Sequence, residues 1–282
     1  MSHVHAPRES PSDDAEPQEM PEGDTLFRTA AGLRPHLVGK VVTAARATRP
    51  GPQVERIVGS TISAVESQGK NLLIRFDNGL VVRTHLRMNG SWHRYRPGEP
   101  WRRGEARARL VIEVPGAVAV CFDAPVVELF EQRAEGLHPG LGPLGPDLLD
   151  PDWGPDEASE ALRRLRDPAR ADRTISEALL DQRALAGIGN IWRNETLFAE
   201  RIDPFVSVAT IDDRTLERLV ATARRFLRAS VGVAPGRVAL AVYRRAGRPC
   251  RRCGTLIQTR PLAGELPRTT YWCPTCQPKT KA

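Results

Sequence analysis

The feature that most constrains this chain is a set of four cysteines near its end. They form two Cys-x-x-Cys pairs, Cys250 with Cys253 and Cys273 with Cys276, separated by 19 residues. Two such pairs at roughly this separation supply four thiolates for tetrahedral zinc. The residues next to them inside this interval, 255–258 and 269–272, favour extended backbone. We therefore expect a β-hairpin closed by one structural Zn2+, since four cysteines leave no open position for catalysis.

The net charge of the chain indicates which kind of partner it binds. The 282-residue chain carries a net charge of +7, from 41 basic and 34 acidic residues. Residues 1–19 hold one arginine and five carboxylates, so the chain from Met20 onward carries +11. Such a basic body favours a nucleic-acid partner. Arginines crowd the cysteine hairpin in particular, which suits it to phosphates: Arg244, Arg245, Arg248, Arg251, Arg252, Arg260 and Arg268.

Composition excludes several other classes of protein. No apolar run approaches the roughly 20 residues that cross a bilayer, and no signal peptide is visible. Cysteines grouped for a metal indicate a reducing compartment rather than a disulfide framework. We expect a cytoplasmic protein without a membrane partner.

The body of the chain divides into a β-rich part and a helical part. Residues 24–38 have apolar residues at helical spacing, and Gly39 follows as a stop signal. Short β-prone runs then predict an antiparallel β-sandwich behind this one helix. The runs are 41–45, 57–65, 71–76, 80–85, 108–114 and 117–122. Between two of them, Asp77-Asn78-Gly79 predicts a tight hairpin turn.

Beyond the sandwich, the pattern becomes helical. Residues 136–155 have the Gly, Pro and Asp content of a linker. Helical periodicity follows at 156–166, 174–180, 191–201 and 212–230. We expect an α+β multidomain chain with a sandwich domain at 20–135, a helical domain at 156–240, and the hairpin with its tail at 241–282. The Pro-, Ser- and acid-rich residues 1–19 are predicted to be a disordered extension.

A possible catalytic start lies at Met20-Pro21-Glu22-Gly23-Asp24-Thr25, which otherwise predicts only a turn before a helix. Bacterial processing removes a Met that precedes proline, and a free proline amine attacks an aldehyde carbon to form an iminium, an electron sink for β-elimination. Glu22 is then the proton-transfer partner. With residues 1–19 attached, Pro21 is an ordinary imide. Translation starts at Met20, which we favour, or the extension is removed, or this chemistry does not occur.

Three internal stretches suit a nucleic acid, each with an ordinary alternative. Residues 181–190 end in Gly187-Ile188-Gly189-Asn190 before a predicted helix, where a phosphate can approach the backbone, although a capped turn has the same pattern. Lys70 enters a strand in a chain with only four lysines; the alternative is a solvated lysine. Met88 lies where a strand runs into a loop, either as an apolar wedge for a flipped base or as core.

Together, the start at Met20, the run 181–190 and the cysteine hairpin resemble the formamidopyrimidine-DNA glycosylase / endonuclease VIII family of DNA-repair enzymes. The resemblance extends from Met20 to about Gln277. It implies an N-terminal helix with an antiparallel β-sandwich, a helix–two-turn–helix domain and a C-terminal zinc-finger β-hairpin. It also implies a monomer near the nucleoid that binds damaged, duplex DNA.

The resemblance also implies roles for particular residues. Pro21, Glu22 and Lys70 would be catalytic, with Lys70 reaching the phosphate of the damaged nucleotide. Asn190 would bind the phosphate at the lesion, and Glu195 would orient the site. Arg268 matches an arginine of the zinc-finger hairpin that contacts DNA. Met88 would fill the vacated base stack, with Arg87 and Asn89 beside it.

Two departures bear on the chemistry. The family usually has a second glutamate three residues after the catalytic one, where this chain has Thr25. The branch that acts on oxidised purines carries an Arg-rich, Phe-containing loop, and residues 123–129 have neither in place. This difference favours an endonuclease VIII-like enzyme that acts on oxidised pyrimidines.

The function expected is a bifunctional DNA glycosylase and abasic-site lyase of base excision repair, which cuts the strand by β,δ-elimination without a redox cofactor. One alternative is a damage-recognising DNA-binding protein without catalysis, in which Thr25 or the retained extension abolishes the chemistry. Another is a zinc-ribbon transcription or RNA-binding protein, which explains the tail but neither residues 20–25 nor 187–190.

Overall fold

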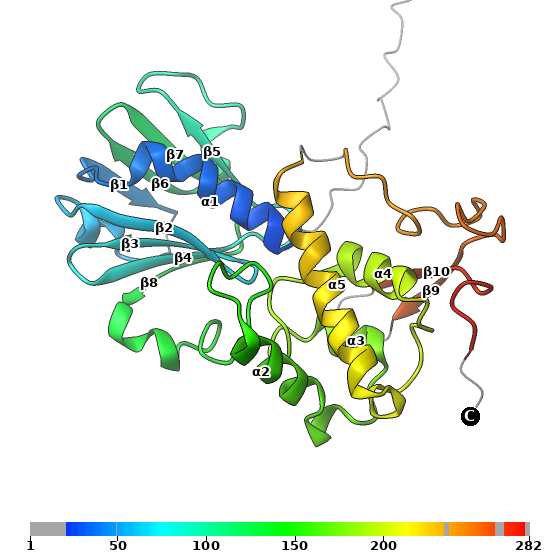
Figure 1. The fold of residues 1–282 in the computed structure, drawn as a ribbon. Helices are drawn as coiled ribbons and strands as arrows, with labels where there is room; N and C mark the ends of the chain where they lie inside the picture. The colour runs from blue at the N-terminus through cyan, green and yellow to red at the C-terminus, as the bar shows by residue number, and fades with distance from the viewer. Residues whose placement is uncertain (1–20, 49, 234–236, 263–267, 280–282) are drawn as a thin grey trace, which may run out of the picture.

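The computed structural model describes residues 21–48, 50–233, 237–262 and 268–279. The extension predicted at residues 1–19 lies outside this range. Figure 1 shows a β-sandwich beside a group of helices, with a small hairpin at the far end of the helical part. The fold agrees with the predicted α+β arrangement of sandwich, helical domain and cysteine hairpin.

The first helix, α1 (Gly23–Leu37), packs against the sandwich and also contacts the last long helix. Its buried residues Leu26, Ala30, Leu33 and Leu37 recur every three or four positions, so one face is apolar. The helix ends at Val38, and Gly39 follows with a φ of 77°. This positive φ is easily adopted by glycine, which explains the stop.

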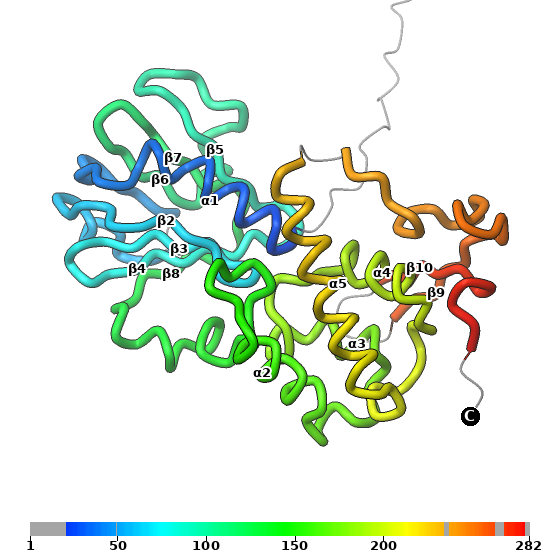
Figure 2. The backbone as a smooth tube through the Cα atoms, viewed as in Figure 1, coloured from blue at the N-terminus to red at the C-terminus, as the bar shows by residue number. Residues whose placement is uncertain are grey.

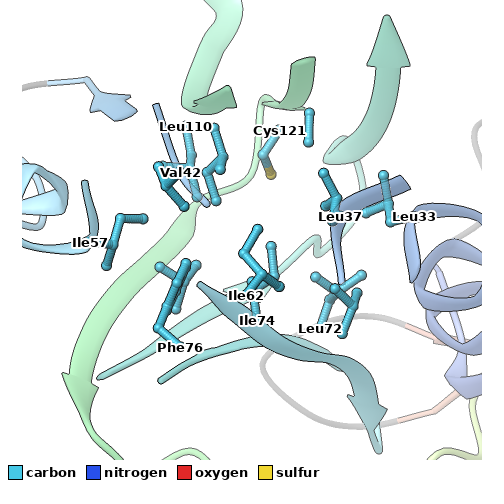
Figure 3. Close-up of a cluster of buried hydrophobic side chains, with 14 of the residues drawn as sticks. Leu33, Leu37, Val42, Ile57, Ile62, Leu72, Ile74, Phe76, Leu110 and Cys121 are labelled. Atoms are coloured by element: carbon cyan, nitrogen blue, oxygen red, sulfur yellow. The ribbon is translucent and has the colours of Figure 1, made fainter. Parts of the chain in front are cut away.

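The sandwich consists of two four-stranded antiparallel sheets. One has the order β2 (Ile62–Gln68), β3 (Asn71–Phe76), β4 (Leu80–His85) and β8 (Val126–Glu131); the other has β1 (Ala44–Ala47), β6 (Ala108–Val114), β7 (Ala117–Phe122) and β5 (Ser91–Tyr95). Side chains from both sheets and from α1 form the core (Figure 3), among them Leu37, Ile74 and Leu110, which are fully buried. Short 3-10 helices lie in the connections: η1 (Val54–Ile57), η2 (Glu105–Arg107) and η3 (Gln132–Leu137).

Four of the six predicted strand runs have the observed bounds, and two do not. Val41 forms only an isolated bridge with Thr61, and β1 begins at Ala44. The run 57–65 is divided, because η1 ends at Ile57 and β2 starts at Ile62. The prediction missed β5 and β8, whose residues are mostly half-buried and include charged side chains.

The residues 136–155, predicted as a linker, are themselves packed. Leu141 lies in a small apolar cluster with Leu73 and Val81 of the sandwich. Leu148 and Leu149 belong instead to the core of the helical part. This segment therefore fixes the sandwich against the helices, as the continuous chain path in Figure 2 illustrates.

Four α-helices form the helical part: α2 (Pro155–Leu165), α3 (Ile175–Leu180), α4 (Asn190–Ala199) and α5 (Asp213–Val231), with η4 (Pro168–Arg170) and η5 (Val208–Thr210) between them. Thr174 and Asp212, predicted as helical, are N-caps whose side chains accept backbone N–H groups. The α4 helix starts one residue earlier than predicted and ends at Ala199, two residues before Arg201, whose φ is 59°.

The cysteine hairpin pairs β9 (Gln258–Leu262) with β10 (Arg268–Trp272) in antiparallel register. It packs on α4, and the two lie side by side in Figures 1 and 2. The amide nitrogen of Tyr271 donates to Asn194 Oδ1 at 2.9 Å, and Asn190 Nδ2 donates to the carbonyl of Thr269 at 3.2 Å. Strand β10 is thus bonded to the start of α4.

Candidate active site

Glu22 lies at the point where the sandwich meets the helices. Its side chain is only 3% exposed. One carboxylate oxygen accepts the N–H of Gly189 at 2.9 Å, and the other accepts the N–H of Ile191 at 2.6 Å. These donors belong to the free amides at the start of α4, which favour a negative group. The next residue, Gly23, donates its N–H to the carbonyl of Gly187 at 2.8 Å.

Lys70 approaches the same point from the turn between β2 and β3. It is 6% exposed. Burial lowers the pKa of Lys70 to about 8; the negative charge of Glu22 opposes this shift and the positive charge of Arg268 adds to it. Burial likewise raises the pKa of Glu22 to about 7, against the charge of Lys70. Both pKa values therefore lie close to neutral pH, which is typical of groups that take part in acid–base chemistry.

A pocket of about 590 Å3 opens beside this pair. Lys70 and Arg268 both line it, so the sandwich and the hairpin share one cavity. Its other lining residues are Asn71, Arg83, His85, Arg87, Met88, Asn89, Asp123, Pro125, Gly140, Leu144 and Gln182. Much of this wall is cationic, as a phosphate-bearing ligand requires.

Met88 lies on the rim of the pocket and not in the core. It is 44% exposed, at the tip of the loop between β4 and β5. Arg87, next to it, has a φ of 50°, a strained value for a residue with a side chain. Arg87, Met88 and Asn89 are all exposed. The structure thus brings these three predicted residues to the same pocket as Lys70 and Arg268.

Asn190 and Glu195 have different surroundings from those three. Asn190 is half-buried at the first turn of α4, where its Oδ1 accepts from Arg193 at 2.6 Å. Glu195 does not line the pocket: it is 6% exposed and accepts the backbone N–H groups of Ala241, Val242 and Tyr243 at 2.8–2.9 Å. It fixes the segment that leads to the cysteine hairpin.

Some residues of the site escaped the sequence analysis. His85 lines the pocket, and burial together with Arg83 and Arg87 lowers its pKa to about 4, so it is neutral at pH 7. Arg193 is fully buried between Asn190 and the carbonyl of Thr269, and two of its nitrogens have no partner within the described residues. An arginine on a predicted helix face gives no sequence signal for such a position.

Thr25 stands half-buried in the first turn of α1, and the carboxylate nearest to it in sequence is Asp24. Asp24 is 6% exposed and accepts from the Ser230 hydroxyl at 2.8 Å and from Arg28 at 3.1 Å. A buried acid therefore follows Glu22 after two residues. It holds the start of α1 to the end of α5.

The four cysteines converge as their spacing predicts. Their Sγ atoms lie within 4.8 Å of one another, Cys253 and Cys273 at 3.4 Å. Three of the four are buried, and Cys253 is exposed. A closed set of four thiol ligands fits a single structural metal ion. This arrangement can hold the hairpin together but offers no position for a substrate.

A sandwich and a helical domain that share one cationic pocket, with a four-cysteine hairpin beside it, define a class of DNA-repair glycosylase fold. Models of two domains match: the formamidopyrimidine-DNA glycosylase N-terminal domain over residues 20–125 and the H2TH domain of the same enzyme over residues 144–240. The chain belongs to this family, and its relatives place it with the endonuclease VIII-like members.

Two relatives are similar over most of their length. The "Probable endonuclease 8 2" of Streptomyces coelicolor is 40% identical over 92% of this chain and 94% of its own. The "DNA-(apurinic or apyrimidinic site) lyase Nei2" of Mycolicibacterium smegmatis is 39% identical, over 92% of this chain and 99% of its own.

Among solved structures, a Lactococcus lactis formamidopyrimidine-DNA glycosylase bound to DNA with an abasic site is 23% identical. It covers 92% of this chain and 100% of its own, with a TM-score of 0.78, which shows the same fold. Within the described part of the chain, no helix is long and apolar enough to cross a bilayer.

Proposed function

We propose that this protein is a bifunctional DNA glycosylase and abasic-site lyase of base excision repair. The observation that carries the proposal is the buried, electrostatically coupled pair Glu22 and Lys70: Lys70 lines the cationic pocket, and Glu22 directly follows Pro21 in the chain. The names of the two relatives, an endonuclease and an abasic-site lyase, support the same activity. A catalytically inactive binding protein would have no need of such a pair.

The chemistry starts at Pro21. Its free secondary amine attacks C1′ of the damaged nucleotide, and the bond from C1′ to the base breaks as the base leaves with its electron pair. Glu22, with a pKa of about 7, is protonated in about half of the molecules at neutral pH and can supply the proton that assists this departure. The C1′–O4′ bond then opens as O4′ takes a proton, and the proline nitrogen, having lost its own proton, forms the iminium. The iminium makes the C2′ proton acidic, so that loss of this proton expels the 3′ phosphate and loss of the C4′ proton then expels the 5′ phosphate. Water releases the sugar fragment and restores the amine.

The same pocket would hold the DNA. Lys70 and Arg268 line this pocket, where Lys70 would bind a phosphate at the lesion and Arg268 would contact the strand from the hairpin. Asn190, at the start of α4 and outside the pocket lining, would bind a phosphate at the lesion as well. Met88, exposed at its loop tip, fills the gap left by the flipped base, with Arg87 and Asn89 beside it. Glu195 acts indirectly, since it fixes the segment that carries the hairpin. Flipping costs a few kcal/mol, which is least for a poorly paired lesion.

The remaining assignments follow from this function. The four cysteines hold one Zn2+, and the domains are 20–135, 156–240 and 241–282, with 136–155 between the first two. Residues 123–129 lack the Arg and Phe of the oxidised-purine branch, which favours oxidised pyrimidines as substrates. We also propose that the protein acts as a monomer in the cytoplasm, at the nucleoid.

Borohydride trapping on a duplex with one abasic site tests the proposal. The 282-residue chain is compared with a chain that begins at Met20, with loss of that Met confirmed by intact mass. Trapping of the shorter chain alone identifies Pro21 as the nucleophile. Trapping of both means that the extension is removed or that another amine, Lys70 first, forms the adduct. If neither chain traps, the lyase is refuted and the binding-protein alternative takes its place.

A further inference from the structure

Asp147 lies behind the active site, at the junction of the two domains. Its side chain is half-buried. One oxygen accepts the N–H of Gly69 at 2.6 Å, and the other accepts the N–H of Leu149 at 2.9 Å. Gly69 immediately precedes Lys70 in the turn between β2 and β3. Asp147, in the packed segment 136–155, is therefore hydrogen-bonded to the turn that carries Lys70, and Lys70 lines the pocket.

The backbone around Asp147 is also hydrogen-bonded to the helical domain, at Ala186. Asp147 forms a parallel bridge with Ala186, flanked by hydrogen bonds from Ala186 N to the carbonyl of Pro146 and from Leu148 N to the carbonyl of Ala186, at 3.0 and 3.2 Å. The loop that follows Ala186 supplies the amides that hold Glu22. One residue thus connects the turn of Lys70 to the loop that binds Glu22.

The junction leaves almost no room for movement. A Cβ on Gly69 would lie 3.3 Å from the Cβ of Ala186, and a Cβ on Gly187 would lie 3.1 Å from Asp147 Oδ1. Both glycines have positive φ, 56° and 94°. Gly69 and Gly187 contribute no side chain to this contact, and the hydrogen bond from Gly69 N–H to the Asp147 carboxylate is a side-chain contact that holds the turn of Lys70 against the loop.

Stability does not account for a carboxylate at this position. Burial raises the pKa of Asp147, and the backbone N–H groups of Leu149 and Gly69 oppose this shift only in part. An acid whose folded pKa is raised stabilises the fold fully only below its unfolded pKa, and this contribution is lost as the pH rises through the folded value. Near neutral pH, the charge of Asp147 therefore costs stability.

We propose that Asp147 is a positioning residue, which holds the Gly69–Lys70 turn against the helical domain so that Lys70 stays buried beside Glu22. The inference rests on the proposed function for its catalytic consequence but not for its effect on Lys70. Released from Asp147, the turn moves outward and Lys70 enters water. Three other groups interact with the charge of Lys70 directly: Glu22, Arg268 and His85.

Trace acetylation with acetic anhydride tests this directly. The labelling of each lysine is followed by mass spectrometry against pH, with the exposed Lys40 as an internal standard. Three chains that begin at Met20 are compared: the natural sequence, Asp147→Asn and Asp212→Asn. Asp212 is the matched control, since it also accepts a backbone N–H, that of Thr215 at 2.8 Å, but at the exposed start of α5. Asp147→Ser is the second variant, because a serine hydroxyl can still accept from Leu149 but is too short to reach Gly69.

The labelling midpoint of Lys70 is expected near pH 8 in the natural sequence and in Asp212→Asn, and at clearly higher pH in Asp147→Asn and Asp147→Ser. The trapping rate should fall about tenfold or more in both Asp147 variants. Affinity for a duplex with a non-cleavable abasic analogue, and the Tm, should stay near those of the control. An unchanged midpoint overturns the inference, as does a parallel fall of Tm, affinity and rate. If the natural sequence fails to trap while the midpoint still moves, only the proposed function is lost.

Discussion

At the scale of single residues, the chemistry depends on two groups whose pKa values are both moved toward neutral pH. Glu22 and Lys70 are each buried, and burial acts on them in opposite directions, raising the pKa of the acid and lowering that of the amine. The positive charge of Lys70 lowers the pKa of Glu22, and the negative charge of Glu22 raises the pKa of Lys70, so each charge opposes the effect of burial on the other group. A change at one residue must therefore appear in the titration of the other.

Lys70→Met makes this coupling measurable. Without the cation that opposes its shift, the pKa of Glu22 should rise further above about 7. A protonated Glu22 then persists to higher pH, so the alkaline limb of the single-turnover excision profile should move upward. The rate itself should fall about 10²-fold, as when one electrostatic contact to a reacting group is lost.

Lys40→Met is the control for that experiment, because Lys40 is exposed in the connection between α1 and β1. It should leave both the rate and the profile unchanged. A Lys70→Met enzyme that loses rate with no movement of the alkaline limb would show that Glu22 is not the proton donor on that limb.

Predictability from sequence differs from residue to residue for clear reasons. The cysteine ligands could be predicted because Cys-x-x-Cys spacing is a local constraint. The surroundings of Glu22 could not, since its amide donors lie 167 and 169 residues further along the chain. Glu195 was predicted at the site but binds backbone 46–48 residues away, at a segment with no sequence signal of its own.

At the scale of elements, strands with apolar faces could be predicted and strands without them could not. β3 and β7 are buried along almost their whole length and have the predicted bounds. β5 reads Ser-Trp-His-Arg-Tyr, and only Tyr95 is buried, so its alternation is hidden among polar side chains. β5 forms a strand because it pairs with β7 in antiparallel register. Ser91 lies opposite Phe122 at one end, and Tyr95 lies opposite Val118 at the other.

The loop between β4 and β5 permits a test of the wedge. Met88→Ala should slow excision from duplex DNA by about tenfold, because an alanine cannot support the stack after a base is extruded, a step that costs a few kcal/mol. Excision from single-stranded DNA of the same sequence should change little. Val58→Ala is the control, since Val58 is equally exposed, at 45%, but does not line the pocket. Equal losses on both substrates would contradict the wedge.

The cysteine hairpin should depend on its metal for its shape. Asn190 and Arg193 both donate to the carbonyl of Thr269, so an unfolded hairpin also loses its contact with α4. Cys273→Ser should lower the zinc content from one ion per chain to near zero and weaken DNA binding about tenfold. Elemental analysis and a binding titration measure the two effects. Cys121→Ala is the control: Cys121 is buried in the sandwich and does not belong to the four-cysteine set, so this variant should keep one zinc ion per chain.

At the scale of the whole molecule, the active site exists only while the two domains touch. Glu22 comes from the sandwich side, its amide donors come from α4, and Arg268 comes from the hairpin. Neither domain contains the complete set. The contact between Gly23 and Gly187 lies at the centre of this junction, with the N–H of Gly23 bonded to the carbonyl of Gly187 at 2.8 Å.

Gly23→Ala should therefore separate the domains by a small distance. The new Cβ would lie 2.8 Å from the Cα of Gly187 and 3.0 Å from its carbonyl oxygen, and backbone atoms cannot rotate aside as a side chain can. A displacement of about 1 Å at a reacting group costs about 10²-fold in rate, so excision and trapping should fall by that order. Gly32→Ala, in the same helix but with open space around it, should keep full activity and gain about 0.5–1 kcal/mol in stability. Single-turnover rates and thermal unfolding of the two variants separate the effects, and a fully active Gly23→Ala enzyme would show that the junction tolerates movement.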